Sequence, residues 1–185
     1  KPTQEAGYFL SANRGKHSVT CDITTEEGQK IIHALAKKSD ILIENFKVGG
    51  LKKYGLAYED LSKENPALIY CSITGFGQTG PCADQAGYDY MIQAMGGLMS
   101  ITGKPDDEPG GEPMRVGIPI ADLMTGMYAT TGILAALTNR NETGTGQHID
   151  IALFDTQLAM LANQAMNYLL TNNAPGRIGN CHPNI

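Results

Sequence analysis

The run Ala67–Phe76 (ALIYCSITGF) is the feature that most constrains the fold, because it is almost continuously apolar over the length of one β-strand. Two further segments, His17–Ile23 (HSVTCDI) and Asp40–Phe46 (DILIENF), also have strand character. Helical patterns separate each of these segments from the next. Apolar strands that alternate with helices are typical of a parallel sheet covered on both faces. The first half of the chain therefore predicts an α/β fold.

The expected helices have recognisable starts and ends. The first, TTEEGQKIIHALAKKSD, carries Thr24 and Glu27 at the spacing of a capping box. The second, LAYEDLSKENP, ends before Pro66, because proline lacks the N–H that a helix interior needs. In the second half of the chain we expect helices over about 88–102, 119–139 and 154–171, with a short strand HIDIAL before the last of them.

The composition restricts the classes of partner. A chain of 185 residues is long enough for one sizeable hydrophobic core. The net charge of −5 argues against a protein that binds nucleic acid. No stretch approaches the ~18 uninterrupted apolar residues of a membrane span, so we expect no membrane association and a cytoplasmic location. The four cysteines are widely spaced and form no C-x-x-C pair, which favours free thiols and no bound metal.

The segment GFGQTG, with Gly75, Gly77 and Gly80, has the spacing of a dinucleotide-binding loop directly after a strand. That loop works only when its last glycine leads into a helix whose N-terminus faces a pyrophosphate. Here Gly80 is followed by Pro81 and a polar stretch, and the next helical pattern begins near Tyr88. The spacing therefore favours a sharp turn at a strand end over binding of NAD or FAD.

The segment RVGIPIADLMTGMYATTGILAAL places a single carboxylate, Asp122, at the start of an apolar helix. If Pro119 lies near the first helical position, Asp122 falls in the first turn, where free N–H groups and the helix dipole stabilise an anion. One interpretation is a helix-start charge. The other is a nucleophile, because an ionised carboxylate needs no general base and the small neighbours Ala121, Thr125 and Gly126 leave room for a large group.

Two other segments carry polar residues where α/β proteins bind ligands. In AGYDYMIQAMGG, Tyr88 and Asp89 stand at the head of an apolar helix. In ENFKVGGLKKYG, a strand end leads through a glycine turn to Lys52 and Lys53, which have the charge to pair with a phosphate. Each segment also has a structural interpretation, with Asp89 as a helix-start charge and the lysines as a solvated helix start.

Six segments in order resemble the class III CoA-transferases, the formyl-CoA-transferase-like family that also includes carnitine CoA-transferase and the 2-methylacyl-CoA racemases. The segments are NRGKHSVTCDI, ILIENFKVGGLKKYGL, NPALIYCSITGFGQTGP, AGYDYMIQAMGGLMSITG, VGIPIADLMTGMYATTGILAAL and TGTGQHIDIALFD. The resemblance implies an α/β fold with a Rossmann-like parallel sheet and an interlocked homodimer. Residues 1–185 would be part of the large CoA-binding domain, and the helical region 119–172 would lead out of it.

The resemblance also implies that the chain is a fragment. It begins at Lys1 without an initiator Met and stops within a loop-like segment, GNCHPNI. The first strand of the domain, the C-terminal remainder and a glycine-rich loop of the active site would then lie outside it.

The resemblance assigns roles to individual residues. Asp122 and Asp89 are the implied catalytic residues, with Asp122 as the nucleophile. Residues implied in CoA binding are Asn45, Phe46, Lys53, Tyr54 and Tyr88. Thr24 stands where many transferases carry a lysine, so one phosphate contact is absent.

The function implied is transfer of CoA from an acyl-CoA donor to a small carboxylic acid through a covalent aspartyl intermediate. CoA is then a substrate, and no tightly bound cofactor is expected. One alternative is a racemase, in which a histidine occupies the position of Tyr88; tyrosine is a poor base at neutral pH. The others are a non-catalytic CoA- or nucleotide-binding module and an NAD-dependent dehydrogenase.

Overall fold

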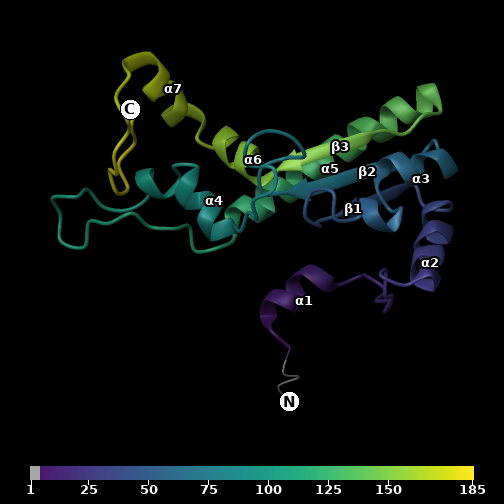
Figure 1. The fold of residues 1–185 in the computed structure, drawn as a ribbon. Helices are drawn as coiled ribbons and strands as arrows, with labels where there is room; N and C mark the ends of the chain where they lie inside the picture. Colours follow the sequence, from purple (N-terminus) through teal and green to yellow (C-terminus); the bar gives the residue numbers. More distant parts are fainter. Residues whose placement is uncertain (1–4) are drawn as a thin grey trace.

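The computed structural model describes residues 5–185. Its centre is a parallel sheet in the order β1-β2-β3 (Figure 1). The strands are β1 (Ile41–Glu44), β2 (Ile69–Thr74) and β3 (His148–Ala152). In the register of the sheet, Cys71 lies opposite Ile43 on one side and Ile149 on the other. The predicted α/β class is therefore confirmed.

Helices connect and flank these strands (Figure 1). They are α1 (Gly7–Asn13), α2 (Glu26–Ala36), α3 (Tyr58–Glu64), α4 (Asp89–Met95), α5 (Ile120–Thr143), α6 (Leu153–Ala159) and α7 (Ala162–Thr171), with short 3-10 turns η1 (Lys52–Tyr54) and η2 (Met99–Ile101). Parallel strands need such crossovers because the end of one strand and the start of the next lie at opposite edges of the sheet.

One face of the sheet packs against α5. Ile69 and Cys71 of β2 are buried there against Ala129, Ile133 and Ala136 of α5. The small alanines let the helix approach the branched side chains of the strands closely. Burial also raises the pKa of the Cys71 thiol to about 11, so this cysteine is an unreactive core residue.

The opposite face packs against α2, η1 and α3. Its buried residues are Ala36, Leu51, Leu56, Leu61, Leu68 and Tyr70. The Tyr70 hydroxyl donates to the carbonyl of Leu56 at 3.1 Å, which satisfies this buried polar group. Along β2, side chains alternate between the two faces, as a strand inside a sheet requires.

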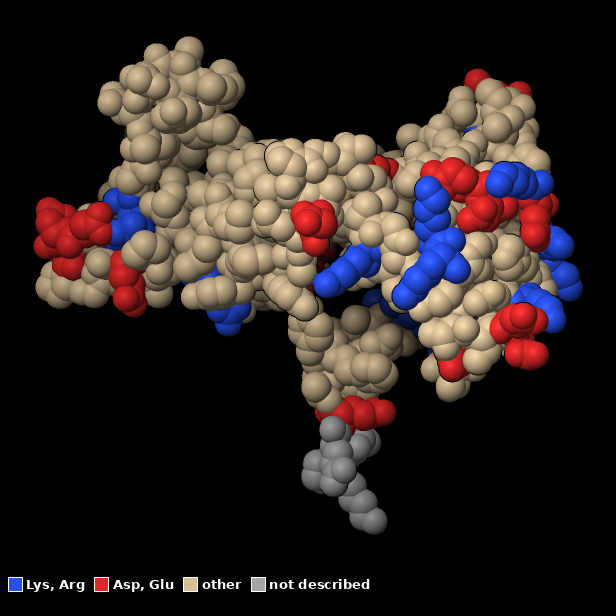
Figure 2. All heavy atoms as spheres, viewed as in Figure 1, with Lys and Arg blue, Asp and Glu red and all other residues tan. Residues whose placement is uncertain are grey.

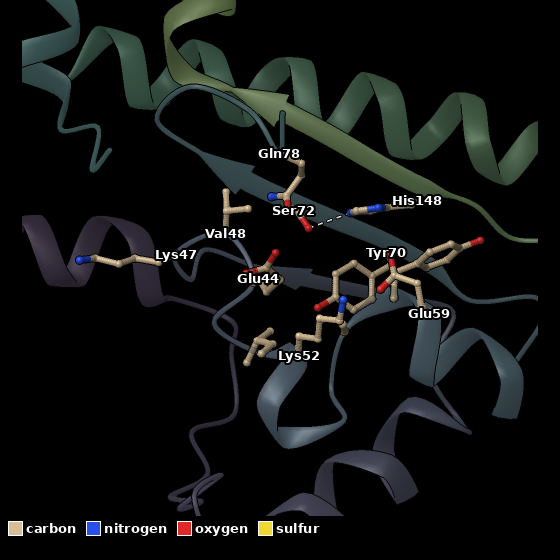
Figure 3. Close-up of a pocket in the computed structure, with 13 residues that line it drawn as sticks. Glu44, Lys47, Val48, Lys52, Glu59, Tyr70, Ser72, Gln78 and His148 are labelled. Atoms are coloured by element: carbon tan, nitrogen blue, oxygen red, sulfur yellow. Dashed lines mark hydrogen bonds between the residues drawn. The ribbon is translucent and has the colours of Figure 1, made fainter. Parts of the chain in front are cut away.

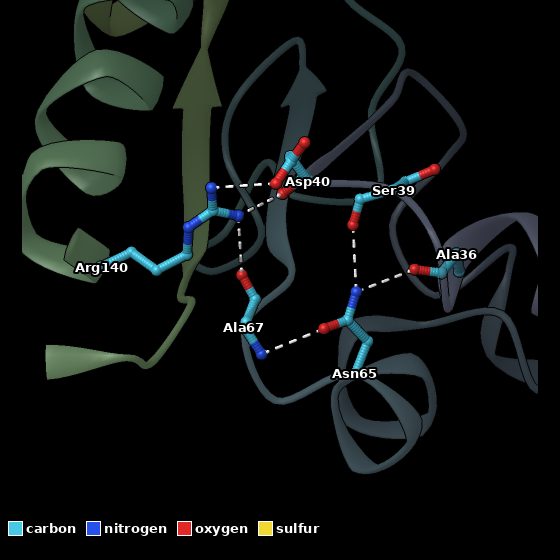
Figure 4. A network of polar contacts seen from close by, with 6 residues as sticks. All are labelled: Ala36, Ser39, Asp40, Asn65, Ala67 and Arg140. Atoms are coloured by element: carbon cyan, nitrogen blue, oxygen red, sulfur yellow. Dashed lines mark hydrogen bonds and ion pairs between the residues drawn. The ribbon is translucent and has the colours of Figure 1, made fainter.

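Two polar side chains join the segments that precede the strands (Figure 4). The Asn65 amide donates to the carbonyls of Ala36 and Ser39 at 2.9 and 3.0 Å. Arg140, near the end of α5, pairs with the Asp40 carboxylate at 3.0 Å and donates to the carbonyl of Ala67 at 3.3 Å. Asn65 and Arg140 thus hold α2, β1, β2 and α5 together at the amino ends of the strands.

Two expectations in the N-terminal part are wrong. His17–Ile23 is not a strand, because no neighbouring strand in the described part of the chain pairs with its backbone. The cap of α2 is Thr25, whose Oγ1 accepts from the N–H of Gly28 at 3.1 Å. Thr24 instead donates its hydroxyl to Asp22 at 2.7 Å, so the capping box is not formed.

Three helix boundaries differ from the expected ones. The helix at 88–102 ends at Met95, because Gly96 packs against the Gln157 side chain and Gly97 has a φ of +82°. The helix expected over 154–171 is divided into α6 and α7, and Ala162, at the start of α7, has a φ of +45°. The helix expected to end near 139 continues to Thr143, where Gly144 terminates it in the left-handed conformation.

The outer surface of α5 is apolar. Leu123, Met127 and Leu134 are each more than half exposed. By length and composition alone α5 is able to cross a membrane, and a helix packed against a sheet passes the same test. Figure 2 shows charged side chains over α2 and α3 and around the acidic loop of residues 103–113 before α5, whereas α7 presents an uncharged surface.

Candidate active site

A cavity of about 340 Å³ lies at the carboxyl end of the sheet, between β2, α4 and the start of α5. It is lined by Asn45, Ile73, Gly87, Tyr88, Asp89, Asp122, Thr125, Gly126 and Leu153. Four of the residues predicted for the site, Asn45, Tyr88, Asp89 and Asp122, therefore meet here although three separate segments carry them. The carboxyl ends of parallel strands are the usual ligand-binding position in open α/β sheets.

Asp122 occupies the first turn of α5, as predicted from Pro119, which is the N-cap residue. Pro119 supplies no side-chain cap. The Asp89 carboxylate does so instead, because its Oδ1 accepts from the N–H of Ala121 at 2.8 Å and from that of Asp122 at 3.3 Å. Asp89 is thus the first residue of α4 and the cap of α5 at once. This double role connects the two interpretations of Asp89, as a helix-start charge and as a site residue.

A close backbone contact brings α4 to the sheet. A Cβ on Gly75 would lie 2.5 Å from the nitrogen of Gly87, and a Cβ on Gly87 would lie 2.3 Å from the Cα of Gly75. Both positions therefore require glycine. Because Gly75 follows β2 and Gly87 precedes Tyr88 and Asp89, this contact sets the distance of both side chains from the strand ends.

The electrostatic environment of Asp122 favours its neutral form more than water does. Burial raises the pKa of the Asp122 carboxyl above its usual range, and the negative charge of Asp89 raises it further. The Tyr8 side chain of α1 acts in the opposite direction. A carboxylate that is less well solvated is also a stronger nucleophile toward a bound electrophile.

A second, smaller cavity of about 170 Å³ adjoins the first. The two share Asn45, Gly87 and Tyr88, and Phe46 lines only the second. The Asn45 amide donates to the carbonyl of Ile73 at 2.5 Å, which ties the segment after β1 to β2. Tyr88 is 74% exposed, so its ring stands at the opening between the two cavities and is available to a ligand.

A third cavity, of about 310 Å³, lies on the face of the sheet opposite α5 and shares Lys47 and Val48 with the second (Figure 3). Inside it, the Oγ of Ser72 lies 2.9 Å from Nε2 of His148, and the His148 ring stacks on Tyr58 with centroids 5.1 Å apart. The sequence analysis missed this pair. The alternation of side chains along a strand could have predicted it, because Ser72 and His148 both lie on the face of the sheet that is turned away from α5.

Lys53 and Tyr54 lie outside these three cavities. The Lys53 ammonium is 4.7 Å from the centroid of the Tyr54 ring, and Tyr54 packs against the core of α2 and α3. The neighbouring Lys52 lines the third cavity. The structure therefore separates the two lysines of the predicted basic pair, and the role of Lys53 stays a prediction.

Gly80 is followed by turns and bends, and the next helix begins at Asp89. The interpretation of GFGQTG as a turn at a strand end agrees with this course of the chain, which presents no helix N-terminus to a pyrophosphate. Among residues 5–185, no group of three or more histidine, cysteine, aspartate or glutamate side chains is arranged to hold a metal ion.

Fold and site together define an α/β protein with two carboxylates, Asp89 and Asp122, at a helix start beside the carboxyl end of a parallel sheet. The chain belongs to the CoA-transferase family III, whose pattern matches residues 1–185. The predicted resemblance is thereby confirmed. The chain is 56% identical over 180 residues to succinate--glutarate CoA-transferase of Agrobacterium fabrum, covering 97% of this chain and 44% of that protein. It is 45% identical to acetyl-CoA:oxalate CoA-transferase of Acetobacter aceti, covering 95% and 44%.

A solved structure has the same fold. The crystal structure of a CAIB/BAIF family protein from Brucella suis superposes with a TM-score of 0.92 at 57% sequence identity, over 97% of this chain and 47% of that one. The chain therefore spans less than half the length of the relatives it matches. This coverage agrees with the expectation of a fragment.

Proposed function

We propose that the protein to which this chain belongs transfers CoA from an acyl-CoA donor to a carboxylic acid, with Asp122 as the covalent acyl carrier. The observation that carries the proposal is the cavity in which a capped, partly desolvated Asp122 meets Asn45, Tyr88 and Asp89. The family and the names of the relatives supply the reaction class.

The reaction is a series of acyl exchanges. An Asp122 oxygen attacks the thioester carbon, the C–S bond breaks, and CoA leaves as the thiolate, which gives a mixed anhydride. The thiolate then attacks the aspartyl carbonyl, releases the donor acid and forms an aspartyl-CoA thioester. The acceptor carboxylate attacks this thioester and releases CoA thiolate again. The thiolate finally attacks the acceptor's acyl carbon, which yields the new acyl-CoA and regenerates the Asp122 carboxylate.

The adjoining cavities offer a path for a CoA thioester. The reacting carbonyl would lie in the first cavity beside Asp122, and the pantetheine arm would pass Asn45 and Phe46 in the second. The phosphates would then reach the lysine-bearing segment between Lys47 and Lys53. Lys47 points away from the Ser72–His148 pair in Figure 3, so its charge is available at the rim.

The acceptor we propose is a dicarboxylic acid. The names of the relatives include succinate, glutarate, oxalate and mesaconate, all of which carry two carboxyl groups. One carboxylate would attack the aspartyl thioester, and the other requires a cationic or hydrogen-bonding partner. Segments of the protein outside this chain would contribute to that partner.

We also propose that the full protein is a homodimer. The apolar side chains Leu123, Met127 and Leu134 of α5 and Leu169 and Leu170 of α7 are exposed in this chain. An uncharged surface of this kind is typical of a face that further protein covers. We propose that the remainder of the protein and a second copy of it pack against these apolar side chains.

Mass spectrometry of the full-length protein tests the proposal. The protein is incubated with a panel of acyl-CoA thioesters and trapped with hydroxylamine, and the peptide that contains Asp122 is examined. We expect a modified Asp122 with at least one donor and no modification in Asp122→Asn. Asp155→Asn is the matched control, because Asp155 also lies in the first turn of a helix but lines none of the three cavities.

The outcomes separate the alternatives. CoA binding without an adduct for any donor overturns the covalent mechanism and favours a binding module. Exchange of the α-proton of a 2-methylacyl-CoA without CoA transfer favours a racemase. A change in nicotinamide absorbance favours a dehydrogenase.

A further inference from the structure

Gln93 is a fully buried glutamine one helical turn after Asp89 on α4. Its Nε2 donates to Oδ2 of Asp89 at 2.6 Å, and its Oε1 accepts from the N–H of Val116 at 2.9 Å. Both ends of the amide are thus bonded, one within α4 and one in the segment that leads into α5. A buried amide with both ends satisfied holds its partners in one geometry, since any movement would leave a polar group without a bond.

The Asp89 carboxylate divides its oxygens between two tasks. Oδ2 is bound by Gln93, and Oδ1 caps the N–H groups of Ala121 and Asp122. A carboxylate that is hydrogen-bonded through only one of its oxygens can rotate about the bond between Cβ and Cγ. A second donor on the other oxygen prevents this rotation. Gln93 is that donor, and the hydrogen bond to Val116 fixes the chain three residues before Pro119 at the same time.

We infer that Gln93 is a positioning residue for Asp122: it orients the Asp89 carboxylate against the first turn of α5 and so sets where the Asp122 carboxylate stands in the cavity. The inference rests on the proposed function of Asp122 as nucleophile. An attacking oxygen must lie within about 3–3.5 Å of the carbon it attacks, so loosening the start of α5 lowers the rate of attack more than it weakens CoA binding.

The chain offers a matched control in Gln157. It is also fully buried, on α6, where it packs against Gly96. Neither its Nε2 nor its Oε1 has a hydrogen-bond partner among the described residues. Replacing either glutamine with methionine preserves an unbranched side chain of similar length. Gln93→Met removes two hydrogen bonds to the site, whereas Gln157→Met removes none.

The experiment uses the full-length protein and two measurements. The first is the single-turnover rate of adduct formation on Asp122, and the second is the Kd for CoA. We expect Gln93→Met to slow adduct formation roughly tenfold or more while the Kd for CoA changes less than about twofold. Gln157→Met is expected to stay within about twofold of the unaltered protein in both measurements.

A double-mutant cycle tests whether Gln93 acts through Asp89. We expect Gln93→Met to slow Asp89→Ala little further, because the carboxylate that Gln93 orients is already absent. If the two substitutions instead lower the rate of adduct formation independently, so that their fold-changes multiply, Gln93 supports the fold without acting on Asp89. Gln93→Glu keeps the shape and replaces the N–H donor with an oxygen; it is the variant to use if Gln93→Met does not fold, and we expect an equal or larger loss of rate.

The results distinguish failure of the inference from failure of the proposed function. Normal adduct formation in folded Gln93→Met or Gln93→Glu, with an adduct in the unaltered protein, overturns only the role of Gln93. An equal change in rate and in Kd also overturns it. Absence of an adduct in the unaltered protein overturns the function of Asp122, and the role of Gln93 falls with it.

Discussion

The Oδ1 of Asp89 accepts a hydrogen bond from the backbone N–H of Asp122, 33 residues further along the chain. Two carboxylates are thereby held at one helix start, where the free N–H groups stabilise negative charge. Asp89 uses these N–H groups as a cap, and Asp122 extends from the same turn into the cavity. The pair is asymmetric: the Asp89 carboxylate accepts hydrogen bonds on both oxygens, whereas the Asp122 carboxylate lines the cavity.

Replacement of Asp89 with alanine removes both its charge and its hydrogen bonds. Asp89→Ala removes the cap of α5, which we expect to cost about 1 kcal/mol in the free energy of unfolding. It also removes the negative charge that raises the pKa of Asp122. We therefore expect slower adduct formation at neutral pH, together with an acidic limb of the rate profile that moves to lower pH. A profile that keeps its position would contradict the coupling between the two carboxyl groups.

The raised pKa of Asp122 predicts that this residue reduces stability. The unfolded chain ionises at the ordinary aspartate value, so the folded state binds more protons between the two pKa values. The penalty is present above the folded pKa and disappears as the pH falls through it. We expect Asp122→Asn to be more stable than the unaltered protein at neutral pH, by less than about 1 kcal/mol because solvent screens the side chain. Urea unfolding at several pH values measures this; a difference that grows toward low pH would contradict it.

Lys52 and Lys53 test where the phosphates of CoA bind. The resemblance assigns the phosphate contact to Lys53, whereas Lys52 is the one that lines a cavity. Replacing the lysine that binds a phosphate with alanine should raise the Kd for CoA about 5- to 30-fold, which is about 1–2 kcal/mol. The Kd for dephospho-CoA should change less if the contact is to the 3′-phosphate. Isothermal titration of both variants with both ligands compares them directly. Kd values equal to those of the unaltered protein in both variants would exclude a phosphate contact from Lys52 and from Lys53.

The contact between Gly75 and Gly87 predicts strong sensitivity to a single methyl group. In Gly87→Ala the new Cβ would overlap the Gly75 backbone, so the segment carrying Tyr88 and Asp89 must move away from the sheet. We expect a loss of about 1–3 kcal/mol in stability and a larger proportional loss of adduct formation. Gly176→Ala is a suitable control, because a Cβ there meets no atom within 4 Å. Equal effects of the two substitutions in denaturation and single-turnover assays would refute the prediction.

Asn65 predicts a stability effect without a catalytic one. Asn65→Ala removes the donors to the carbonyls of Ala36 and Ser39 and the acceptor for the N–H of Ala67. We expect the free energy of unfolding to fall by about 2 kcal/mol, since three hydrogen bonds to partly buried backbone groups are lost. The rate of adduct formation at a temperature where the protein is folded should be unchanged, because these groups lie at the amino ends of the strands, away from the cavity.

Elements whose signals are local are predictable from the amino-acid sequence. The apolar run of β2, the alternation of strands and helices, and the position of Asp122 after Pro119 all depend on residues close together in the chain. Local patterns failed where a distant partner decides the outcome. His17–Ile23 has the composition of a strand but no paired neighbour among the described residues, and the helix at 88–102 ends early because Gly96 packs against Gln157.

The assembly of the site depends on how distant segments pack in the folded protein. Asp89 and Asp122 were both predicted as site residues, but their relationship through the cap of α5 requires α4 to pack against α5. The same packing buries Gln93. The register of β2 with β3 places Tyr70 opposite His148, and from there the His148 ring reaches the hydroxyl of Ser72. Hydrogen bonds between residues far apart in sequence leave no periodic pattern, because each depends on one geometry of the folded chain rather than on a repeat that a helix or strand imposes.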